Sequence, residues 1–438
     1  MNSLLIKGGR VIDPTSKIDG VRDILIEDGK IKAVSGKQKA MPTGRQAVSG
    51  NTQIVDAKGC LVLPGLIDMH AHLRDPGRPD KETIASGSRA AALGGFTTVC
   101  CMANTSPPID NPAVVEYIIA KAKNEAVVNV LPVAAITKGL KGEELAEMGR
   151  CAAEGAIAFS DDGKPIMNAN IMRHALEYAR QFDRVVISHC EDATLSKDGS
   201  MNEGKVSTQI GLPGIPSLAE EIMVARDIML AREYGKVHIA HVSSAGSVKL
   251  LRQAKREGVP ISCETCPHYF ALTEEAVRDY DTNAKVNPPL RSDSDVAAVI
   301  KGLKDGTIDV IATDHAPHNI EEKNVEFNLA ANGMVGLETA LSLVLTGLVG
   351  SKALNLSQAV EKLSCAPAKI LGLSTKGSLK SGMDADLIIV DPKAEWVVDA
   401  SQFASKSKNT PFNSWKLNGK VLYTIVGGRV VVRDGKLV

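Results

Sequence analysis

Strand-like and helix-like segments alternate eight times through the middle of the chain, and this alternation restricts the fold more than any other feature of the sequence. The eight apolar, strand-like runs end near His70, Asn104, Ile136, Asp162, Cys190, Ser243, Pro267 and His315. Between them lie segments rich in alanine, leucine and charge at helical spacing, such as 84–94, 111–124, 141–153, 168–181, 217–234 and 245–257. Alternating strands and helices predict an α/β fold with a parallel sheet, and eight repeats predict closure into a (β/α)8 TIM barrel. Periodicity leaves an open doubly wound sheet as the alternative.

Both ends of the chain differ from this middle part, because they contain short apolar runs separated by glycine-containing turns. These runs are 4–6, 23–26, 30–34 and 54–55 at the start, and 385–390, 421–426 and 430–432 at the end. Short strands need partners to bury their apolar faces, so we expect the two ends to pair in one small β-sandwich domain. The predicted ranges are 1–63 and 371–438 for the two parts of this domain and 64–370 for the barrel.

The composition points to a small-molecule ligand. Among 438 residues, Lys plus Arg and Asp plus Glu number 51 each, so no net charge draws the chain to nucleic acid or to an anionic membrane. No uncharged apolar run of about 18 residues occurs, and the N-terminus reads as no secretory signal. The eight scattered cysteines favour reduced thiols in the cytoplasm. Cys263 and Cys266 form a single CxxC without a second pair, so we expect no structural zinc there.

Residues that bind metals or move protons stand at five of the predicted strand ends. They are His70, His72, Asp162, His189, His241 and Asp314. In a barrel the carboxyl ends of all strands meet on one face, so residues far apart in sequence become neighbours. Alternate side chains of an extended backbone point the same way, so both histidines of His70-Ala71-His72 can bind one ion.

These residue types suit zinc, which prefers nitrogen, sulfur and carboxylate ligands. Four histidines and two aspartates exceed the needs of one tetrahedral ion. We therefore expect two zinc ions that share Asp162 and a hydroxide. A lone His-x-His is usually part of an ordinary strand, but its conjunction with histidines and aspartates at other strand ends favours a metal site. His174, His238 and His268 have ordinary structural interpretations, and only His268 is placed to border the pocket.

The chain resembles the amidohydrolase superfamily, and specifically its class I dihydroorotases, over nearly its whole length. The motifs that carry the resemblance are 64–77 (PGLIDMHAHLRDPG), 102–105 (MANT), 159–163 (FSDDG), 286–291 (VNPPLR) and 313–318 (TDHAPH). The first motif is shared in outline by many amidohydrolases, whereas the arginine directly after His-x-His-Leu favours dihydroorotases.

The resemblance implies a role for each residue of these motifs. It assigns the first zinc to His70, His72 and Asp314, and the second to His189 and His241. Asp162 is the implied bridge, with Asp161 as an alternative, and Asp314 is also the implied catalytic acid and base. The implied substrate-binding residues are Arg74, Asn104, Asn287, His318, Asn332 and Gly333. A guanidinium offers a fork of donors matched to a carboxylate such as that of dihydroorotate.

Two details separate the chain from close relatives. Hydantoinases and dihydropyrimidinases typically bridge their metals with a carboxylated lysine, whereas this strand reads Phe-Ser-Asp-Asp and Lys164 follows only after a glycine. Class I dihydroorotases often show Pro-Phe-Gly where this chain reads Ala331-Asn332-Gly333. We therefore expect backbone contacts to substrate from this loop, but no apolar lid formed by phenylalanine.

The implied activity is the reversible interconversion of N-carbamoyl-L-aspartate and L-dihydroorotate in de novo pyrimidine biosynthesis. Another cyclic amidase, such as a dihydropyrimidinase, hydantoinase or allantoinase, is an alternative that would share the metal site. A second alternative is a non-catalytic partner of aspartate carbamoyltransferase, but such proteins generally lose metal ligands, and none is missing here. The resemblance also suggests a homodimer and association with aspartate carbamoyltransferase.

Overall fold

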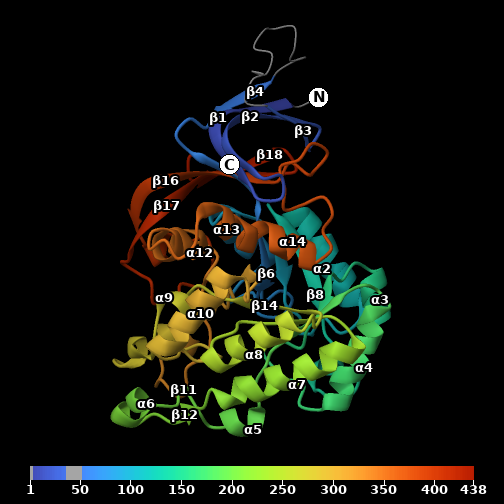
Figure 1. Cartoon of the computed structure of the whole chain (residues 1–438), viewed down its shortest axis with the longest axis vertical. Helices are drawn as coiled ribbons and strands as arrows, with labels where there is room; N and C mark the ends of the chain where they lie inside the picture. Colours follow the sequence, from blue (N-terminus) through green and yellow to red (C-terminus); the bar gives the residue numbers. More distant parts are fainter. Residues whose placement is uncertain (1–2, 36–51) are drawn as a thin grey trace.

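The computed structural model describes residues 3–35 and 52–438. Of the predicted N-terminal range 1–63, residues 1–2 and 36–51 therefore lie outside the described residues. The chain folds into an eight-stranded parallel barrel surrounded by helices, with a mixed sheet above it that combines both ends of the chain (Figure 1).

The mixed sheet joins the first and last strands of the chain. Its strands are β1 (Ser3–Asp13), β2 (Ile18–Glu27), β3 (Lys30–Val34), β4 (Gln53–Asp56), β5 (Leu61–Pro64), β16 (Leu387–Val397), β17 (Lys416–Val426), β18 (Arg429–Arg433) and β19 (Lys436–Leu437). The two ends meet where β5 pairs antiparallel with β16. Ile6, Val62, Ile389 and Ile425 from both ends are fully or almost fully buried in one apolar cluster. The predicted pairing of the chain ends is thereby confirmed.

The second sheet is the barrel. Its strands are β6 (Leu66–Ala71), β7 (Phe96–Cys101), β8 (Asn129–Ala134), β9 (Ala158–Phe159), β10 (Val185–Ser188), β13 (Val237–Ile239), β14 (Ile261–Thr265) and β15 (Val310–Ile311). Neighbouring strands run parallel throughout. A single parallel bridge between Ala71 and His315 joins the first strand to the last, and the His72 N–H donates to the His315 carbonyl at 2.8 Å. This closure excludes the open doubly wound sheet.

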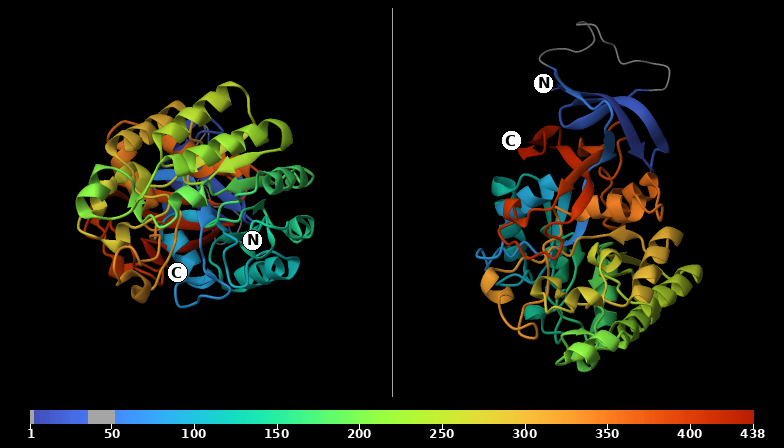
Figure 2. Two further views of the ribbon diagram at one scale, coloured as in Figure 1. Left: turned by 90° about the horizontal axis from the view of Figure 1, so that it is seen from below. Right: turned by 90° about the vertical axis from the view of Figure 1, so that its left-hand side faces the viewer.

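Helices cover the outside of the barrel (Figure 2). The longer ones are α1 (Ile84–Leu93), α2 (Pro112–Glu125), α4 (Ala169–Arg180), α7 (Leu218–Tyr234), α8 (Ala245–Arg256) and α10 (Asp293–Asp305). The shorter ones are α3 (Met148–Ala153), α5 (Ala193–Ser196), α6 (Lys205–Ile210), α9 (His268–Ala271), α11 (Ile320–Lys323), α12 (Ala340–Leu343), α13 (Leu356–Val360) and α14 (Ala366–Ile370). A two-stranded ribbon, β11 (Met201–Asn202) with β12 (Gly214–Ile215), follows β10, and 3₁₀ or π turns lie at 138–140, 274–277, 282–284, 344–349, 361–365 and 400–402.

The predicted helix 141–153 is wrong over its first half, because α3 begins only at Met148. Two glycines in the preceding stretch, Gly139 and Gly142, have left-handed backbone angles that an α-helix does not accommodate. The Ala146 N–H instead donates to the Ile136 carbonyl at 2.8 Å, which folds the stretch into a loop.

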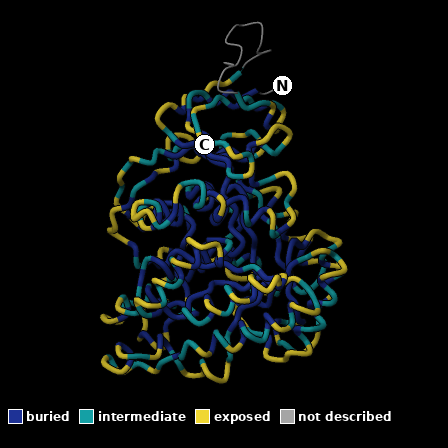
Figure 3. The backbone as a smooth tube through the Cα atoms, viewed as in Figure 1, coloured by how far each residue is buried: buried dark blue, intermediate teal, exposed yellow. Residues whose placement is uncertain are grey.

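Nearly all residues of the barrel strands are buried, as expected for a parallel sheet covered by helices, and exposed residues are confined mainly to the outer segments (Figure 3). Each predicted strand end lies within four residues of the observed one. The polar residues quoted at the predicted ends mostly follow the last paired residue, and they belong to the loops on the carboxyl face of the barrel. None of the described helices is both long and apolar enough to cross a membrane.

Candidate metal centre and substrate pocket

A pocket of about 200 Å³ opens on the carboxyl face of the barrel. It is lined by His72, Arg74, Asn104, Asp162, Gly163, His189, His241, Asn287, Asp314, Ala316, His318, Asn332 and Gly333. All residues predicted for the site line this pocket except His70. The His70 side chain is fully buried behind the lining, and its Nε2 lies 3.2 Å from Asp162 Oδ2. The structure therefore brings together residues that lie up to 263 positions apart in the chain, from His70 to Gly333.

Asp162 lies at the centre of the cluster and faces two pairs of imidazoles. Its Oδ2 lies 3.2 Å from His70 Nε2 and 3.5 Å from His72 Nε2. Its Oδ1 lies 3.4 Å from His189 Nδ1 and 3.4 Å from His241 Nε2. Each pair, together with Asp162, places its ligand atoms within 4.8 Å of one another. The carboxylate is therefore arranged to bridge two neighbouring cations.

Asp314 completes the first group. Its Oδ1 lies 3.1 Å from His72 Nε2 and 3.5 Å from His70 Nε2. A third set of buried groups, Cys266 and His268 with Asp314, also places its ligand atoms within 4.8 Å of one another, but it shares Asp314 with the first group. His268 thus borders the same centre, as its position after a strand suggested. The eight cysteines, Cys266 among them, form no disulfide bonds.

The neighbouring carboxylate and lysine are turned away from this centre. Asp161 Oδ1 accepts the backbone N–H groups of Ile136 and Thr137 at 2.8 and 3.0 Å, and its Oδ2 accepts the Thr137 hydroxyl. Lys164 is exposed. Among the described residues, Asp162 is thus the carboxylate placed between the two groups, and neither Asp161 nor Lys164 occupies the bridging position.

Three buried atoms at or beside this centre lack hydrogen bonds within the described structure. They are His70 Nε2, Asp162 Oδ1 and His268 Nε2. A buried polar atom without a partner is costly, and bound ions are one reason for such an atom to persist. Together with the nitrogen and carboxylate donor set, these orphaned atoms fit metal ions held between the imidazoles and Asp162.

Outer hydrogen bonds orient both histidines of the first motif. His70 Nδ1 lies 2.6 Å from Glu264 Oε1, and Glu264 Oε2 lies 3.1 Å from His238 Nε2. His72 Nδ1 lies 2.8 Å from Asn104 Oδ1. In each case an acceptor holds the Nδ1 proton, so the Nε2 lone pair points into the centre, which is the arrangement that metal-binding histidines require.

Sequence reasoning missed Glu264, which is fully buried within β14 between the two cysteines of the CxxC. An ionisable residue in the middle of a buried barrel strand was the available signal, because burial of a charge requires a partner. Burial opposes ionisation, but the charges of His70 and His238 outweigh it and lower the pKa of Glu264 to about 2. Glu264 is thus a carboxylate at neutral pH.

The two central carboxylates are ionised as well. Burial would raise the pKa values of Asp162 and Asp314, but the positive charge of His70 and contacts with the other imidazoles hold both well below the usual range. Reciprocally, burial would lower the pKa of His70, and the surrounding carboxylates raise it well above its usual value. Protons held between such groups are those that a bound metal cation displaces.

Backbone strain marks three residues of the site. Arg74, His241 and Asp314 have φ angles of 57°, 35° and 47°, in the left-handed region that non-glycine residues rarely adopt. Strain of this kind persists where the surrounding structure imposes it, and it concentrates at functional sites. Each of these residues lies where the chain leaves a barrel strand, so the strained turn directs its side chain into the pocket.

The remaining lining residues form the opposite wall. Arg74 Nε donates to the Pro317 carbonyl at 3.2 Å, and its guanidinium reaches His318. His318 Nε2 lies 2.9 Å from the Asn332 carbonyl. Asn287 Nδ2 donates to Glu191 Oε2 at 2.9 Å, and Glu191 also contacts His189 Nε2 at 2.9 Å. The metal-binding part of the pocket therefore carries carboxylates and imidazoles, and the rest of the lining, here called the substrate wall, carries a cation, amide groups and the His318 imidazole.

Comparison with known proteins gives consistent results along the chain. A model described as dihydro-orotase-like matches residues 59–247, and one described as amidohydrolase family matches residues 294–432. A dihydroorotase from Acetivibrio thermocellus is 58% identical over 433 residues, 98% of this chain and 99% of that protein. A dihydroorotase from Syntrophus aciditrophicus is 55% identical over 432 residues, again 98% and 99%.

Solved structures share the same fold. The L-hydantoinase (dihydropyrimidinase) from Arthrobacter aurescens matches 100% of this chain and 98% of its own, with a TM-score of 0.88 and 27% identity. The dihydropyrimidinase from Brevibacillus agri NCHU1002 has a TM-score of 0.86 at 23% identity, covering 100% and 96%, and indicates the fold alone.

Proposed function

The chain belongs to the dihydroorotase family of amidohydrolases, and we propose that it interconverts N-carbamoyl-L-aspartate and L-dihydroorotate in de novo pyrimidine biosynthesis. The observation that carries this proposal is a pocket that brings a complete set of metal-binding residues together with a half-buried arginine, Arg74. A ring amide bound between these residues meets the hydrolytic groups while its carboxylate meets the guanidinium. A non-catalytic partner of another enzyme would have no need of the complete ligand set.

The ligand set suits two zinc ions. His70, His72 and Asp314 would hold one, His189 and His241 the other, and Asp162 both. When bound, such ions lower the pKa of coordinated water toward neutrality and polarise the carbonyl oxygen of the substrate. Glu264 and Asn104 keep the two Nδ1 protons away from the centre, so His70 and His72 offer their Nε2 atoms.

Asp314 is the proposed acid and base. Its low pKa leaves it ionised at neutral pH, so it enters the reaction as a carboxylate with oxygens free to take up a proton. In hydrolysis it takes a proton from the water that attacks the ring carbonyl, and gives it to the ring nitrogen as the carbon–nitrogen bond breaks. In ring closure the ureido nitrogen attacks the carbon of the protonated side-chain carboxyl group, and Asp314 takes the nitrogen's proton and gives it to the hydroxyl, which leaves as water when the carbon–oxygen bond breaks.

The residues of the substrate wall orient the substrate. Burial lowers the pKa of Arg74 to about 10, so the guanidinium stays charged at neutral pH and can pair with the ring carboxylate. Asn104 and Asn287 each use one side-chain atom in a hydrogen bond to a protein neighbour. These bonds orient both side-chain amides, whose other atoms can contact the substrate. The loop with Asn332 and Gly333 supplies backbone groups at the rim.

Parallel assays on dihydroorotate and hydantoin test this function. The unmodified enzyme should hydrolyse dihydroorotate and leave hydantoin, which lacks the carboxylate. Arg74→Met should lower kcat/KM for dihydroorotate about hundredfold, the effect of losing roughly 3 kcal/mol of charged hydrogen bonding. Arg89→Met, at an exposed position of α1, is the matched control and should change nothing. Preferential turnover of hydantoin by the unmodified enzyme would instead favour another cyclic amidase.

The family also suggests a homodimer and an association with aspartate carbamoyltransferase, and the eight free thiols suit the cytoplasm. Light scattering of the purified chain, alone and mixed with aspartate carbamoyltransferase, tests both assemblies. A monomer that stays monomeric in the mixture would contradict them.

A further inference from the structure

A segment from the C-terminal part of the chain reaches the substrate wall of the pocket. Residues 404–410, here called the strap, lie between the sheet strands β16 and β17. The strap belongs to the range 371–438 that sequence reasoning assigned to the small domain, yet its hydrogen bonds run to loops of the barrel. A role for the strap in substrate recognition rests on the proposed function of the pocket.

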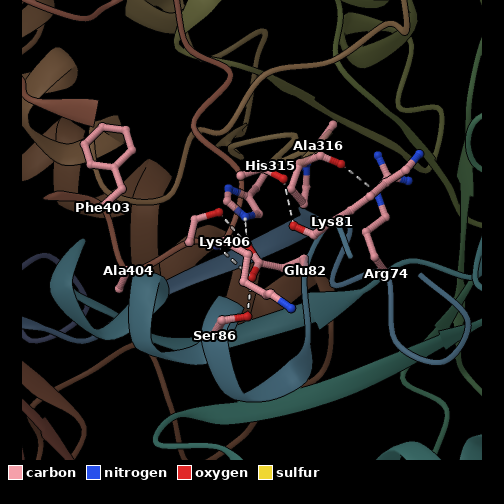
Figure 4. Close-up of polar contacts among 12 residues, drawn as sticks. Arg74, Lys81, Glu82, Ser86, His315, Ala316, Phe403, Ala404 and Lys406 are labelled. Carbon is pink, nitrogen blue, oxygen red and sulfur yellow. Dashed lines mark hydrogen bonds and ion pairs between the residues drawn. The ribbon is translucent and has the colours of Figure 1, made fainter. Parts of the chain in front are cut away.

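Two glutamates, the fully buried Glu82 and the half-buried Glu338, fix the beginning of the strap. Glu338 accepts the backbone N–H groups of Ala404 and Ser405 at 3.1 and 3.2 Å. Glu82 accepts the Ser405 hydroxyl at 2.5 Å and the Lys406 N–H at 3.3 Å. Figure 4 shows the Glu82 carboxylate between His315 and Ser86, with Ala404 on one side and Arg74 on the other.

Glu82 thus connects the strap to the place where the barrel closes, because its Oε2 also lies 3.2 Å from Nε2 of His315, which bridges to Ala71. Further along, the Ser407 hydroxyl donates to the Lys81 carbonyl at 2.7 Å. With its first residues fixed in this way, the strap places Asn409 directly behind the pocket-lining residues Ala316, His318 and Gly333.

Asn409 is buried and uses every hydrogen-bonding atom of its side chain on that wall. Its Oδ1 accepts the His318 backbone N–H at 3.1 Å. Its Nδ2 donates to the carbonyls of Ala316 and Gly333, both at 3.1 Å. Its own carbonyl accepts the Val335 N–H at 2.9 Å. One side chain therefore ties the loop after β15 to the loop that carries Asn332 and Gly333.

The two loops approach each other very closely at Gly333 and Ala316. Gly333 has a φ of 132°, which side chains rarely tolerate, and a Cβ there would lie 2.6 Å from Ala316 Cβ. One parallel bridge, between His315 and Met334, joins their backbones, with the Ala316 N–H donating to the Met334 carbonyl at 2.9 Å. Beyond this single bridge, the separation of the loops depends on side-chain contacts such as those of Asn409. A side chain with one acceptor and two donors matches the one N–H and two carbonyls presented to it.

We propose that Asn409 is a positioning residue for the substrate carboxylate, because it sets the distance between His318 and the Gly333 loop across the mouth of the pocket. It touches neither the metal-binding wall nor Asp314 in these contacts. Loss of Asn409 should therefore weaken binding of the carboxylate while the hydrolytic wall stays intact.

Asn409→Ala and Asn409→Asp test this role. Alanine leaves the two carbonyls without a donor, and aspartate turns a negative oxygen toward them. Both variants should raise KM for dihydroorotate about tenfold or more, the loss expected for one to two net hydrogen bonds, with kcat within about threefold of the unmodified enzyme. The dissociation constant of orotate, which carries the same carboxylate, should rise in parallel, while zinc per chain stays unchanged.

Asn413→Ala is the matched control. This exposed asparagine accepts the Ala400 N–H at 2.9 Å, away from the pocket, and its loss should leave KM unaltered. If Asn409→Ala does not fold, Asn409→Ser carries the same comparison. An unmodified enzyme that ignores dihydroorotate would overturn the proposed function. Normal turnover with unchanged KM and orotate binding in the Asn409 variants, or a fall in kcat and zinc alone, would overturn the positioning role.

Discussion

Asp162→Asn and Asp161→Asn make the same chemical change at adjacent positions, and the geometry predicts opposite results. Asp162 faces one imidazole pair with each oxygen, so both proposed ions lose a ligand when its charge is removed. A four-ligand zinc site supplies about 10–16 kcal/mol, so one ligand is worth about 3 kcal/mol to each ion. Affinity for each should fall roughly hundredfold.

Asp161→Asn should keep its metal and lose stability instead. The side chain accepts two backbone N–H groups and the Thr137 hydroxyl, and asparagine can retain the first two through its oxygen. The lost charge assistance should reduce the free energy of unfolding by about 1–3 kcal/mol. Turnover per bound zinc should then stay close to that of the unmodified enzyme.

Zinc per chain after dialysis against a weak chelator, combined with urea unfolding of the metal-free proteins, separates the two effects. The expected pattern is metal loss for Asp162→Asn and reduced stability for Asp161→Asn. Zinc retained by the Asp162 variant but stripped from the Asp161 variant would refute the assignment of the bridge, and equal losses from both would refute the distinction between them.

Three further predictions concern other groups. Asp314→Asn, assayed with enough added zinc to keep the site occupied, should cut kcat by about 10²–10⁴ in steady-state kinetics, and near-normal turnover would remove Asp314 from the mechanism. Glu264→Gln should weaken zinc binding about 10- to 100-fold in chelator competition, because it orients His70, and unchanged affinity would argue against that role. Burial and the charge of Lys285 lower the pKa of Lys323 to about 7. Above that pH the unfolded chain binds a proton that the folded chain does not, so the free energy of unfolding gains up to about 1.4 kcal/mol per pH unit. Lys323→Met should flatten this rise in urea titrations between about pH 7.5 and 9.5, and an unaltered slope would count against the buried lysine.

The barrel could be predicted from the sequence because its strands are buried on both faces and read as continuous apolar runs. The error at 141–153 arose where composition favoured a helix but Gly139 and Gly142 adopt left-handed angles. Local composition does not reveal that the Ala146 N–H pairs with Ile136, since that hydrogen bond joins two ends of a loop.

The polar residues that line the pocket could be proposed because strand ends of a barrel converge and few residue types bind metals. The resemblance pointed to Asp162 as the bridge, but the residues alone could not exclude Asp161, since that depends on which carboxylate meets the backbone of Thr137. Glu264 and Asn409 were missed for a similar reason. Their partners come from segments far away along the chain, and no spacing rule connects them.

The bridge between Ala71 and His315 determines when the metal-binding residues can come together during synthesis of the chain. Ala71 is the middle residue of the His-x-His motif, and His315 directly follows Asp314. The two residues in contact beside this bridge, His72 and Asp314, are separated by 242 positions. A nascent chain therefore carries only part of the ligand set until its eighth barrel strand emerges and docks beside the first. Synthesis of nearly three quarters of the polypeptide must precede any capture of metal by the finished centre.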